Sequence, residues 1–392
     1  MNKYFLDLGY QPLANNYQKK YTYKQDKYKL KLYFNTKNKL VSISKRIPSE
    51  KMFNNKYPYR SSMSKTMQKS FKKLSQKIKK RFKPNLILEI GSNDGALIKN
   101  FKKKSVVGVE PCKNLAQFTK KKGFKIYDSY WTRKLAKKIK YNHGEFDLIY
   151  SANTLTHISN LKDVFHSISY LLSDNGILII EDPSLLECLK KNSYDQFYNE
   201  HIYLFSVMSL NNILKNFNLE IFDVENLKTH GGSLRYYIKK EVNNNFYKTR
   251  NLKNQFQNEI KYGLGNFQTF KNFAKKVKLS KLKLLKILKK LKKKKKKILG
   301  YGATAKAVTI LNYCNINEDL IDIFTDITPD KINKYMPGKN IKIIRYNKKI
   351  LNKYDYVFLG AWNFKNEILN KEKSYIKRGG KFITHVPLPK IF

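Results

Sequence analysis

The segment 89–95, with the sequence Glu-Ile-Gly-Ser-Asn-Asp-Gly, constrains the fold of this chain more than any other. It follows the apolar residues 86–88 and precedes a stretch with helical spacing, residues 96–101. A strand, a glycine turn and a helix N-terminus in this order let backbone N–H groups approach a nucleotide-type ligand. The next apolar run, 106–109, ends on Glu110, at the distance from the turn where an acid holds ribose hydroxyls. We therefore predict a doubly wound α/β sheet with a nucleotide-type ligand at this turn.

The residues of the turn indicate which ligand it serves. Asn93 and Ala96 stand where the dinucleotide fingerprint has its second and third glycine, which argues against NAD. Such a turn also occurs in plain loops, so the assignment depends on two acids. Glu89, just ahead of the turn, is typical of S-adenosylmethionine-dependent methyltransferases, and Glu110 completes the pattern. We expect S-adenosylmethionine at Glu89, Gly91, Ser92, Asn93, Gly95, Glu110, Pro111 and Asn153.

The length of 392 residues and the 41% hydrophobic content allow two or three domains with their own cores. Short alternating runs in residues 1–60 predict a small β-rich N-terminal module, and residues 61–245 carry a helix over 61–83 followed by α/β alternation. Residues 246–297 are helical in pattern. A second strand-glycine-helix unit at 298–305 and strands at 321–326 and 356–360 predict a smaller C-terminal Rossmann-like domain over 246–392.

The location is expected to be cytoplasmic. No apolar run reaches the ~18 to 20 residues that a membrane span needs, and the N-terminus has no apolar signal-peptide core. We therefore expect no membrane insertion. The three cysteines, Cys112, Cys188 and Cys314, form no CxxC pair, which fits a reducing compartment and gives no metal motif.

A formal net charge of +51 would ordinarily suggest a nucleic acid or an anionic membrane as partner. Only eight of the 80 basic residues are Arg, however, and Arg is the residue that reads bases and phosphates in bidentate fashion. We interpret the high charge as compositional drift toward solvated Lys side chains, and we expect no specific nucleic acid as partner. A general attraction to polyanions that weakens with salt would follow from the charge alone. The lysine run 292–297 is expected to be a solvated helix end rather than a binding site.

Three residues of the segment 197–206 could carry chemistry. Tyr198, Glu200 and His201 combine a phenol, an acid and an imidazole soon after a predicted strand end. His is the usual general base near neutral pH, and Tyr can bond a developing oxyanion. Such a cluster can also be purely structural. His157, just past the predicted strand 146–150, is either a loop histidine or a functional one, and the glycines after His230 suggest close approach of the backbone to another group.

The chain resembles the sugar C-methyltransferase family, whose members methylate a carbon of a nucleotide-linked keto-deoxysugar. The matching segments occur in family order over nearly the whole chain, at residues 8–15, 89–95, 108–111, 198–206, 229–235, 300–303 and 335–338. The resemblance implies a class I methyltransferase domain that uses S-adenosylmethionine, with a C-terminal Rossmann-like domain. It also implies that the cluster around His201 is catalytic.

Two departures from the family pattern stand out. Family members usually open with a zinc-binding module of two CxxC pairs. Here residues 35–38, Asn-Thr-Lys-Asn, replace the second pair, and the chain holds no counterpart of the first. Amide side chains do not replace thiolates on zinc, so we expect no metal. The second departure is Asn199, where the family usually has a further histidine.

The resemblance implies a mechanism without a metal. His201 takes a proton from the carbon beside the sugar ketone, Glu200 holds its imidazole, Tyr198 stabilises the enolate, and His157 assists. Tyr57 or Tyr59 reaches the sugar from the N-terminal module; Tyr59 is assigned to catalysis, and Tyr57 and Asn15 to substrate binding. Gly302, Ala303 and Lys306 hold the nucleotide end, unless the C-terminal domain is only a structural lobe.

Two alternatives to a sugar C-methyltransferase remain. One is a methyltransferase that acts on RNA or protein, drawn to its substrate by charge. The other is a nucleotide-sugar-binding protein that has lost catalysis, as the missing cysteines and Asn199 would allow. The sequence leaves open the sugar, the carbon, the nucleotide and the oligomeric state.

Overall fold

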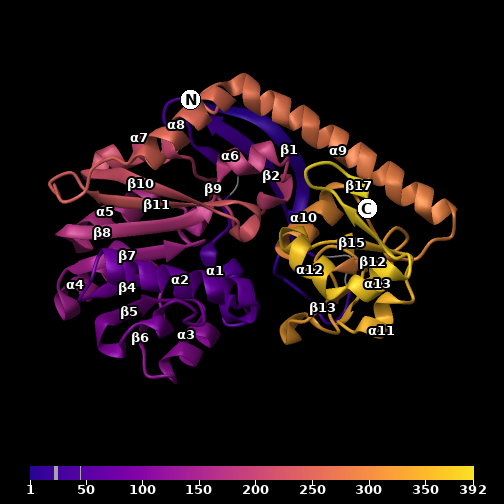
Figure 1. Cartoon of the computed structure of the whole chain (residues 1–392), viewed down its shortest axis with the longest axis horizontal. Helices are drawn as coiled ribbons and strands as arrows, with labels where there is room; N and C mark the ends of the chain where they lie inside the picture. The colour runs from indigo at the N-terminus through magenta and orange to yellow at the C-terminus, as the bar shows by residue number, and fades with distance from the viewer. Residues whose placement is uncertain (22–24, 45) are drawn as a thin grey trace.

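A computed structural model describes residues 1–21, 25–44 and 46–392 of the chain. These residues build a four-stranded, a seven-stranded and a six-stranded β-sheet. In Figure 1 the seven-stranded sheet lies on the left and the six-stranded sheet at the lower right, with the first strands of the chain above and between them. The residues between the two larger sheets therefore come from several parts of the sequence.

The four-stranded sheet is antiparallel and contains the predicted β-rich N-terminal segment. Its strands, in the order β1-β2-β3-β9, are β1 (Asn2–Pro12), β2 (Lys27–Asn35), β3 (Val41–Ile43) and β9 (Tyr203–Leu204). Alternation in β2 buries Leu30, Leu32 and Phe34 on one face. Because β9 comes from residues far along the chain, the N-terminal sheet directly anchors the segment that follows His201.

The seven-stranded sheet has the strand order β10-β11-β8-β7-β4-β5-β6. Its strands are β4 (Ile87–Ile90), β5 (Val106–Val109), β6 (Lys125–Tyr127), β7 (Phe146–Ala152), β8 (Leu172–Pro183), β10 (Leu219–Leu227) and β11 (Ser233–Lys240). The pairs among β6, β5, β4, β7 and β8 are parallel, whereas β11 and β10 form an antiparallel hairpin at one edge. Every residue of β4 and β5 is buried, as helices on both faces require. The predicted doubly wound sheet is confirmed.

Six helices accompany this sheet, namely α2 (Lys65–Arg81), α3 (Lys113–Lys120), α4 (Arg133–His143), α5 (Leu161–Leu171), α6 (Leu185–Lys190) and α7 (Val207–Leu214), and a short helix α1 (Ser49–Met52) precedes them. The predicted helix over 61–83 begins later, because Ser64 caps α2 by accepting the Met67 N–H.

The prediction of a helix over residues 96–101 is wrong. The structure has only a 3-10 turn there, η2 (Ile98–Asn100). The Asn100 side chain donates to the carbonyls of Ala96 and Leu97 at 3.2 and 2.8 Å, which competes with the bonds that would continue a helix. The glycine turn therefore leads into a compact loop.

The six-stranded sheet has the order β14-β13-β12-β15-β16-β17. Its strands are β12 (Ile298–Tyr301), β13 (Ile323–Asp326), β14 (Ile343–Arg345), β15 (Tyr356–Leu359), β16 (Lys381–Thr384) and β17 (Lys390–Ile391), and all pairs except β16–β17 are parallel. Its helices are α10 (Ala305–Tyr313), α11 (Lys348–Leu351), α12 (Lys365–Lys371) and α13 (Lys373–Lys377). We call residues 298–392 the C-terminal lobe; its strand order is the expected Rossmann-like one.

The predicted helical region 246–297 is two helices, α8 (Arg250–Tyr262) and α9 (Phe267–Lys293). Gly263 ends α8 in the left-handed conformation with φ 85°, and the Leu264 N–H returns to the Glu259 carbonyl. In Figure 1 α9 runs along the upper right of the molecule from α8 toward the C-terminal lobe. It also packs on the N-terminal sheet, where the Phe270 ring lies 4.4 Å from the Phe34 ring. Within the described ranges, no helix has the length and apolar character to cross a membrane.

Candidate active site

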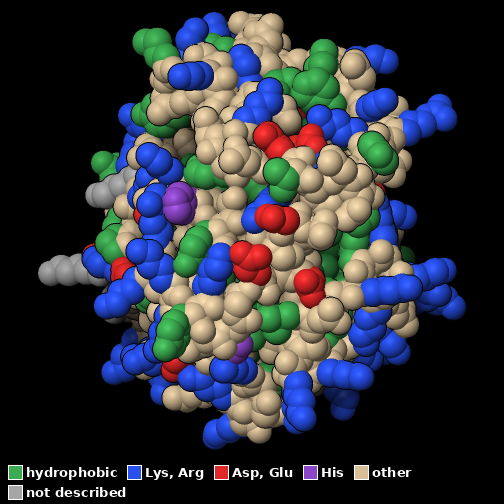
Figure 2. Space-filling view, turned by 90° about the vertical axis from the view of Figure 1, so that its left-hand side faces the viewer, with side chains coloured by type: hydrophobic (Ala, Val, Ile, Leu, Met, Phe, Trp, Pro, Cys, Tyr) green, Lys and Arg blue, Asp and Glu red, His purple; other side chains and the backbone are tan. Residues whose placement is uncertain are grey.

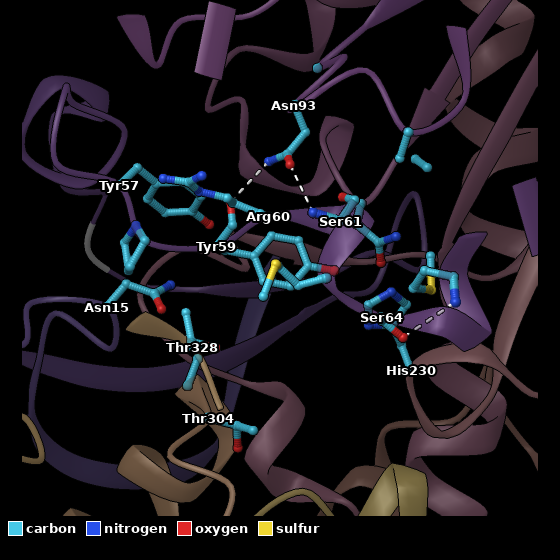
Figure 3. A pocket seen from close by; sticks show the side chains of 18 of the residues that line it. Asn15, Tyr57, Tyr59, Arg60, Ser61, Ser64, Asn93, His230, Thr304 and Thr328 are labelled. Atoms are coloured by element: carbon cyan, nitrogen blue, oxygen red, sulfur yellow. Dashed lines mark hydrogen bonds between the residues drawn. The ribbon is translucent and has the colours of Figure 1, made fainter. Parts of the chain in front are cut away.

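A cavity of about 610 Å³ is lined by residues of both larger sheets and of the segments around them. Its wall contains the glycine turn after β4, the segment from Tyr57 to Lys65, and the glycine turn after β12 in the C-terminal lobe. Figure 3 shows Tyr59 between Asn93, on the side of the first turn, and Thr304 and Thr328 of the C-terminal lobe. A ligand in this cavity can therefore touch both glycine turns.

The first glycine turn has the backbone geometry of a ligand-binding turn. Gly91 has φ 78°, and its N–H donates to the Val109 carbonyl at 2.8 Å, which draws β4 and β5 together at their carboxyl ends. A Cβ at Gly91 would lie 2.0 Å from Thr154 Oγ1. Glycine is therefore required here both by conformation and by the neighbouring loop.

Two buried acids lie beside this turn. Glu110 accepts the N–H groups of Asn93 and Cys112, each at 2.8 Å. Glu89 Oε2 is buried and finds no hydrogen-bond partner among the described residues. Burial, and then the nearby Glu110, raise the pKa of Glu89 well above its usual range. Acceptors without a protein donor are suited to a ligand that brings donors.

The predicted cofactor fits this wall. S-adenosylmethionine carries hydroxyl and amino donors, and the turn offers Glu89, Glu110 and the buried, unpartnered hydroxyl of Ser92 within the described structure. The predicted residues that line the cavity here are Glu89, Gly91, Ser92, Asn93, Glu110, Pro111 and Asn153. Gly95 is not among the described residues that line the cavity; it has φ 76° and contributes to the conformation of the turn.

Asn93 connects the turn to the cavity's other wall. Its side chain accepts the Ser61 N–H at 2.9 Å and donates to the Tyr59 carbonyl at 3.3 Å, as the dashed lines in Figure 3 indicate. The next residue, Asp94, accepts from the backbone N–H and the hydroxyl of Ser62. The segment that carries Tyr57 and Tyr59 is therefore fixed to the cofactor turn.

Tyr198 and His201 form a hydrogen-bonded pair on the cavity wall. His201 Nδ1 lies 2.8 Å from the Gln196 carbonyl oxygen, which can only accept, so Nδ1 carries the proton. Burial, followed by nearby His157 and Lys306, holds the pKa of His201 well below its usual value, so the ring is neutral. Its Nε2 is then an acceptor, and the Tyr198 hydroxyl donates to it at 2.6 Å. The Nε2 lone pair of the imidazole thus points toward Tyr198 and accepts its hydroxyl.

The predicted contact between Glu200 and the His201 imidazole is wrong. The Glu200 carboxylate accepts from Asn15 Nδ2 at 2.7 and 3.0 Å and from the Tyr57 hydroxyl at 3.1 Å. The Gln196 carbonyl occupies the ring nitrogen that a supporting carboxylate would use. Glu200 lies behind the described cavity wall, where it holds Asn15 and Tyr57.

His157, Tyr57 and Tyr59 were also predicted from the sequence to act at the site. The His157 ring stacks between those of His201 and Phe53, with centroids 5.1 and 5.2 Å away. Burial lowers the pKa of His157 to about 3, and its Nε2 has no hydrogen-bond partner within the described structure. Tyr57 and Tyr59 both line the cavity, but only Tyr57 bonds to Glu200.

The second glycine turn repeats the geometry of the first. The Gly302 N–H donates to the Thr325 carbonyl at 2.8 Å, and Gly302 has φ 86°. Asp326, at the end of β13, accepts the Ala303 N–H at 2.8 Å, as Glu110 accepts that of Asn93. Gly302 lines the cavity. Ala303 lies behind the described wall, with its carbonyl bonded to Tyr17 and Lys331 at 2.8 Å each.

Lys306 is a buried cation in the C-terminal part of the cavity wall. Its Nζ donates to the His230 carbonyl at 2.7 Å and lies 5.2 Å from the centre of the Trp362 ring. Burial lowers its pKa to about 8, although Asp195 acts in the opposite direction. Lys306 therefore joins the C-terminal lobe to the hairpin of β10 and β11.

Sequence reasoning missed Asp326, Lys331, Arg60 and His230 as cavity residues. Asp326 carried a usable signal, because it ends the strand that follows a strand-glycine-helix unit. His230 was noted only as part of a turn; it has the left-handed φ of 52° and a buried Nε2 without a partner in the described ranges. Lys331 and Arg60 carried no local signal.

Residues 35–38, which replace the second cysteine pair of the family pattern, form a hydrogen-bonded turn. Asn35 Oδ1 accepts the N–H groups of Lys37 and Asn38 at 3.0 Å each, and its Nδ2 donates to Asn2. In the ranges that the structure describes, no group of three or more His, Cys, Asp or Glu is placed to hold a metal ion. Cys112, Cys188 and Cys314 are free and buried.

Comparison with known proteins gives matches along most of the chain. A family model described as "Methyltransferase domain" matches residues 59–224, and one described as "C-methyltransferase C-terminal domain" matches residues 228–387. C-methyltransferase NovU from Streptomyces niveus is 28% identical over 309 residues, which are 78% of this chain and 73% of NovU.

Solved structures match part of the chain. An S-adenosylmethionine-dependent methyltransferase from Clostridium acetobutylicum gives a TM-score of 0.34 at 14% identity, over 44% of this chain and 92% of that one. N-methyltransferase NodS from Bradyrhizobium japonicum gives a TM-score of 0.35 at 12% identity, over 45% and 98%. The fold assignment depends on the strand order of the seven-stranded sheet and on the family model that covers most of it.

The family models follow each other along the chain as the two large sheets do, and the cavity between these sheets presents a cofactor turn with two acids. The relative NovU spans both parts. The chain is therefore a class I, S-adenosylmethionine-dependent C-methyltransferase, similar to NovU over most of its length.

Proposed function

We propose that this C-methyltransferase adds a methyl group to a carbon beside the ketone of a nucleotide-linked keto-deoxysugar. One observation carries the proposal: the Tyr198–His201 pair lines a cavity that reaches both glycine turns. A base placed between a cofactor turn and a second nucleotide-type turn suits a substrate with a reactive sugar and a nucleotide handle. The ordered motifs shared with sugar C-methyltransferases favour the same substrate class.

His201 is the general base of this proposal. The ketone makes the neighbouring C–H acidic, and the neutral imidazole takes that proton on Nε2 while the C–H electron pair enters the enolate. The Gln196 carbonyl keeps the proton on Nδ1, which preserves the lone pair on Nε2. For this step the Tyr198 hydroxyl turns from Nε2 to the substrate, so the base is released as the substrate is bound.

Tyr198 stabilises the enolate oxygen. Burial, followed by the nearby Glu200, raises the pKa of Tyr198 well above its usual value, so the phenol remains a hydrogen-bond donor. A donor of this kind in a water-poor site is worth roughly two to three orders of magnitude in rate. Tyr57 and Asn15, held by Glu200, approach the sugar from the N-terminal part. The stacked ring of His157 supports the His201 ring from one face.

The cofactor end of the cavity aligns the two reactants. S-adenosylmethionine supplies an activated methyl group there, so the reaction asks of the protein only proton removal, oxyanion stabilisation and alignment. Glu89 and Glu110 would accept from the donors of the cofactor, and Asn93 fixes the Tyr59 segment beside them.

The C-terminal lobe holds the nucleotide end. The match between the Gly302–Asp326 pair and the Gly91–Glu110 pair supports a nucleoside at the second turn, with Asp326 toward its sugar hydroxyls. Lys306, Lys331 and Arg60 line the same cavity and offer positive charge for phosphates.

The test is mass spectrometry of dTDP- and GDP-linked 4-keto-6-deoxysugars after incubation with the protein and S-adenosylmethionine in heavy water. We expect one sugar to gain a CH2 unit. In His201→Ala, deuterium uptake and methyl gain should both fall by about 10²- to 10⁴-fold, with S-adenosylmethionine affinity unchanged. Tyr203→Phe is the matched control, because the Tyr203 hydroxyl bonds to the Ser159 carbonyl away from the cavity.

The alternatives predict different outcomes. Tight binding of a nucleotide sugar without deuterium uptake or methyl gain would favour a protein that has lost catalysis. Methyl transfer to RNA or protein, with none to any sugar, would replace the sugar by a macromolecule. Full turnover by His201→Ala would show that another group is the base.

A further inference from the structure

A buried acid that the proposed mechanism does not use lies at the junction of the active-site segment and the C-terminal lobe. Asp195 belongs to the 3-10 turn η5 (Tyr194–Gln196), six residues before His201, and is fully buried. Its Oδ2 accepts the Trp362 Nε1–H at 2.5 Å and lies 3.1 Å from His385 Nε2. Both partners come from the C-terminal lobe.

Asp195 is held as a carboxylate. Burial on its own would raise the pKa, but His385, Lys306 and Trp362 together bring the pKa below its usual value. Its second oxygen, Oδ1, has no hydrogen-bond partner in the described part of the chain. A buried and incompletely paired charge is expensive in free energy, and hydrophobic packing could have joined the two parts without it.

The residue after Asp195 contacts the base. The Gln196 carbonyl accepts the His201 Nδ1–H at 2.8 Å, and this bond sets the tautomer of the imidazole. The Gln196 side chain donates to the His230 carbonyl at 2.6 Å, and the same carbonyl accepts Lys306 Nζ at 2.7 Å. Two connected routes therefore run from the C-terminal lobe to η5, one through Asp195 and one through the His230 carbonyl.

The packing around these contacts leaves little room for η5 to shift. A Cβ at Gly231 would lie 2.3 Å from the Trp362 ring, and the Tyr194 ring packs against those of Tyr313 and His385, with centroids 5.6 and 6.1 Å away. The position of η5, and with it the Gln196 carbonyl, is thus set by side chains of the C-terminal lobe.

We propose that Asp195 is a positioning residue, through which the docked C-terminal lobe holds the Gln196 carbonyl on His201 and so fixes the base in its reactive tautomer. The proposal rests on His201 being the base. It gives the lobe a second role beside nucleotide binding, because the lobe that would hold the substrate also orders the group that would deprotonate it.

The test compares Asp195→Ala and Trp362→Phe with the wild-type protein and with a control. Trp362→Phe removes one hydrogen bond to Asp195 from the side of the lobe and keeps an aromatic ring, so it answers the question even where Asp195→Ala folds poorly. The control, Gln25→Ala, breaks a different contact with the lobe, the 2.8 Å bond from the Gly338 N–H to Gln25 Oε1. Unfolding by denaturant ranks the stability of all three.

The first readout is nitrogen NMR of protein labelled at its six histidines, with the His201 signal assigned by its loss in His201→Ala. We expect the Nδ1–H tautomer in the wild-type protein and in Gln25→Ala, and a mixture of tautomers in Asp195→Ala and Trp362→Phe. An unchanged His201 signal in both Asp195→Ala and Trp362→Phe would overturn the proposal and leave Asp195 as a purely structural residue.

The second readout is deuterium uptake by the sugar. Asp195→Ala and Trp362→Phe should lower kcat roughly tenfold or more with KM and S-adenosylmethionine affinity within about twofold, because positioning acts on the reacting step. A loss confined to KM would overturn the proposal. Should the wild-type protein exchange no sugar proton at all, the proposed function fails, while the NMR readout still decides whether Asp195 positions His201.

Discussion

The Glu200 carboxyl group is buried and accepts hydrogen bonds from two neutral side chains. Its exposed fraction is 2%, and its partners are Asn15 and Tyr57. Burial raises its pKa to about 7, although the two hydrogen bonds act to lower it. Near neutral pH this residue therefore changes between a carboxylate, which binds both donors strongly, and a carboxylic acid, which binds them weakly.

The raised pKa of Glu200 predicts how stability changes with pH. Between pH 4.5 and about 7 the folded protein retains a proton that the unfolded chain has lost, so the free energy of unfolding falls as pH rises. For this residue the loss amounts to about 3 kcal/mol at pH 7. Denaturant unfolding of the wild-type protein and Glu200→Gln at pH 4.5, 6, 7 and 8 measures it. The variant should lack this decline; parallel stability curves would show that Glu200 titrates normally.

At the level of elements, the two glycine turns are equivalent parts that should serve different ligands. In Gly91→Ala the new Cβ would meet Thr154 Oγ1 at 2.0 Å, and in Gly302→Ala it would meet Ala361 Cβ at 2.5 Å. We expect Gly91→Ala to weaken S-adenosylhomocysteine at least tenfold with dTDP affinity retained, and Gly302→Ala to do the reverse. Isothermal titration calorimetry with the two ligands measures both.

A control separates the clash from backbone strain. Gly144 also has a left-handed φ, 75°, but a Cβ added there would have no described atom within 4 Å. Gly144→Ala should therefore lower stability by about 1 to 3 kcal/mol and leave both affinities unchanged. If Gly91→Ala and Gly302→Ala weakened the same ligand, the two turns would not bind separate molecules.

The turn at residues 35–38 shows how an element can be held without a metal. The Asn35 side chain makes three hydrogen bonds, to Lys37, Asn38 and Asn2, and each is worth about 1 kcal/mol in net stability. We expect EDTA to leave the melting temperature unchanged and Asn35→Ala to lower it by several degrees, as measured by calorimetry. A fall in melting temperature with EDTA, reversed by zinc, would show that a metal stabilises the protein after all.

What the sequence could predict depends on how local the interaction is. The glycine turn and Glu110 lie within about 20 residues, and Tyr198 contacts His201 three positions away, so both were recognisable. The partners of Glu200 lie 185 and 143 residues away, and those of Asp195 are 167 and 190 residues distant. Such contacts exist only after the sheets have packed. This is why the proximity of Tyr198 and His201 could be predicted, whereas the predicted orientation of Glu200 was wrong.

For the whole molecule, the net charge of +51 is a property of the surface rather than of the site. Figure 2 shows Lys and Arg side chains spread over the visible face, mostly toward its edges, with several Asp and Glu nearer the middle. They are not gathered into one stripe on this face, as a nucleic-acid groove would require. Glu89 and Glu110 at the cofactor turn, by contrast, are both buried.

Salt should therefore separate the two kinds of binding. Between 0.05 and 0.5 M NaCl the Debye length falls below about 5 Å, which screens surface lysines much more than buried groups such as Glu89 and Glu110. We expect affinity for single-stranded DNA, measured by fluorescence anisotropy, to fall by several orders of magnitude, and S-adenosylhomocysteine affinity to change by less than about threefold. Tight binding of nucleic acid that survived 0.5 M salt would mean a shaped site for it, and would make a macromolecular methyl acceptor the better explanation of this surface.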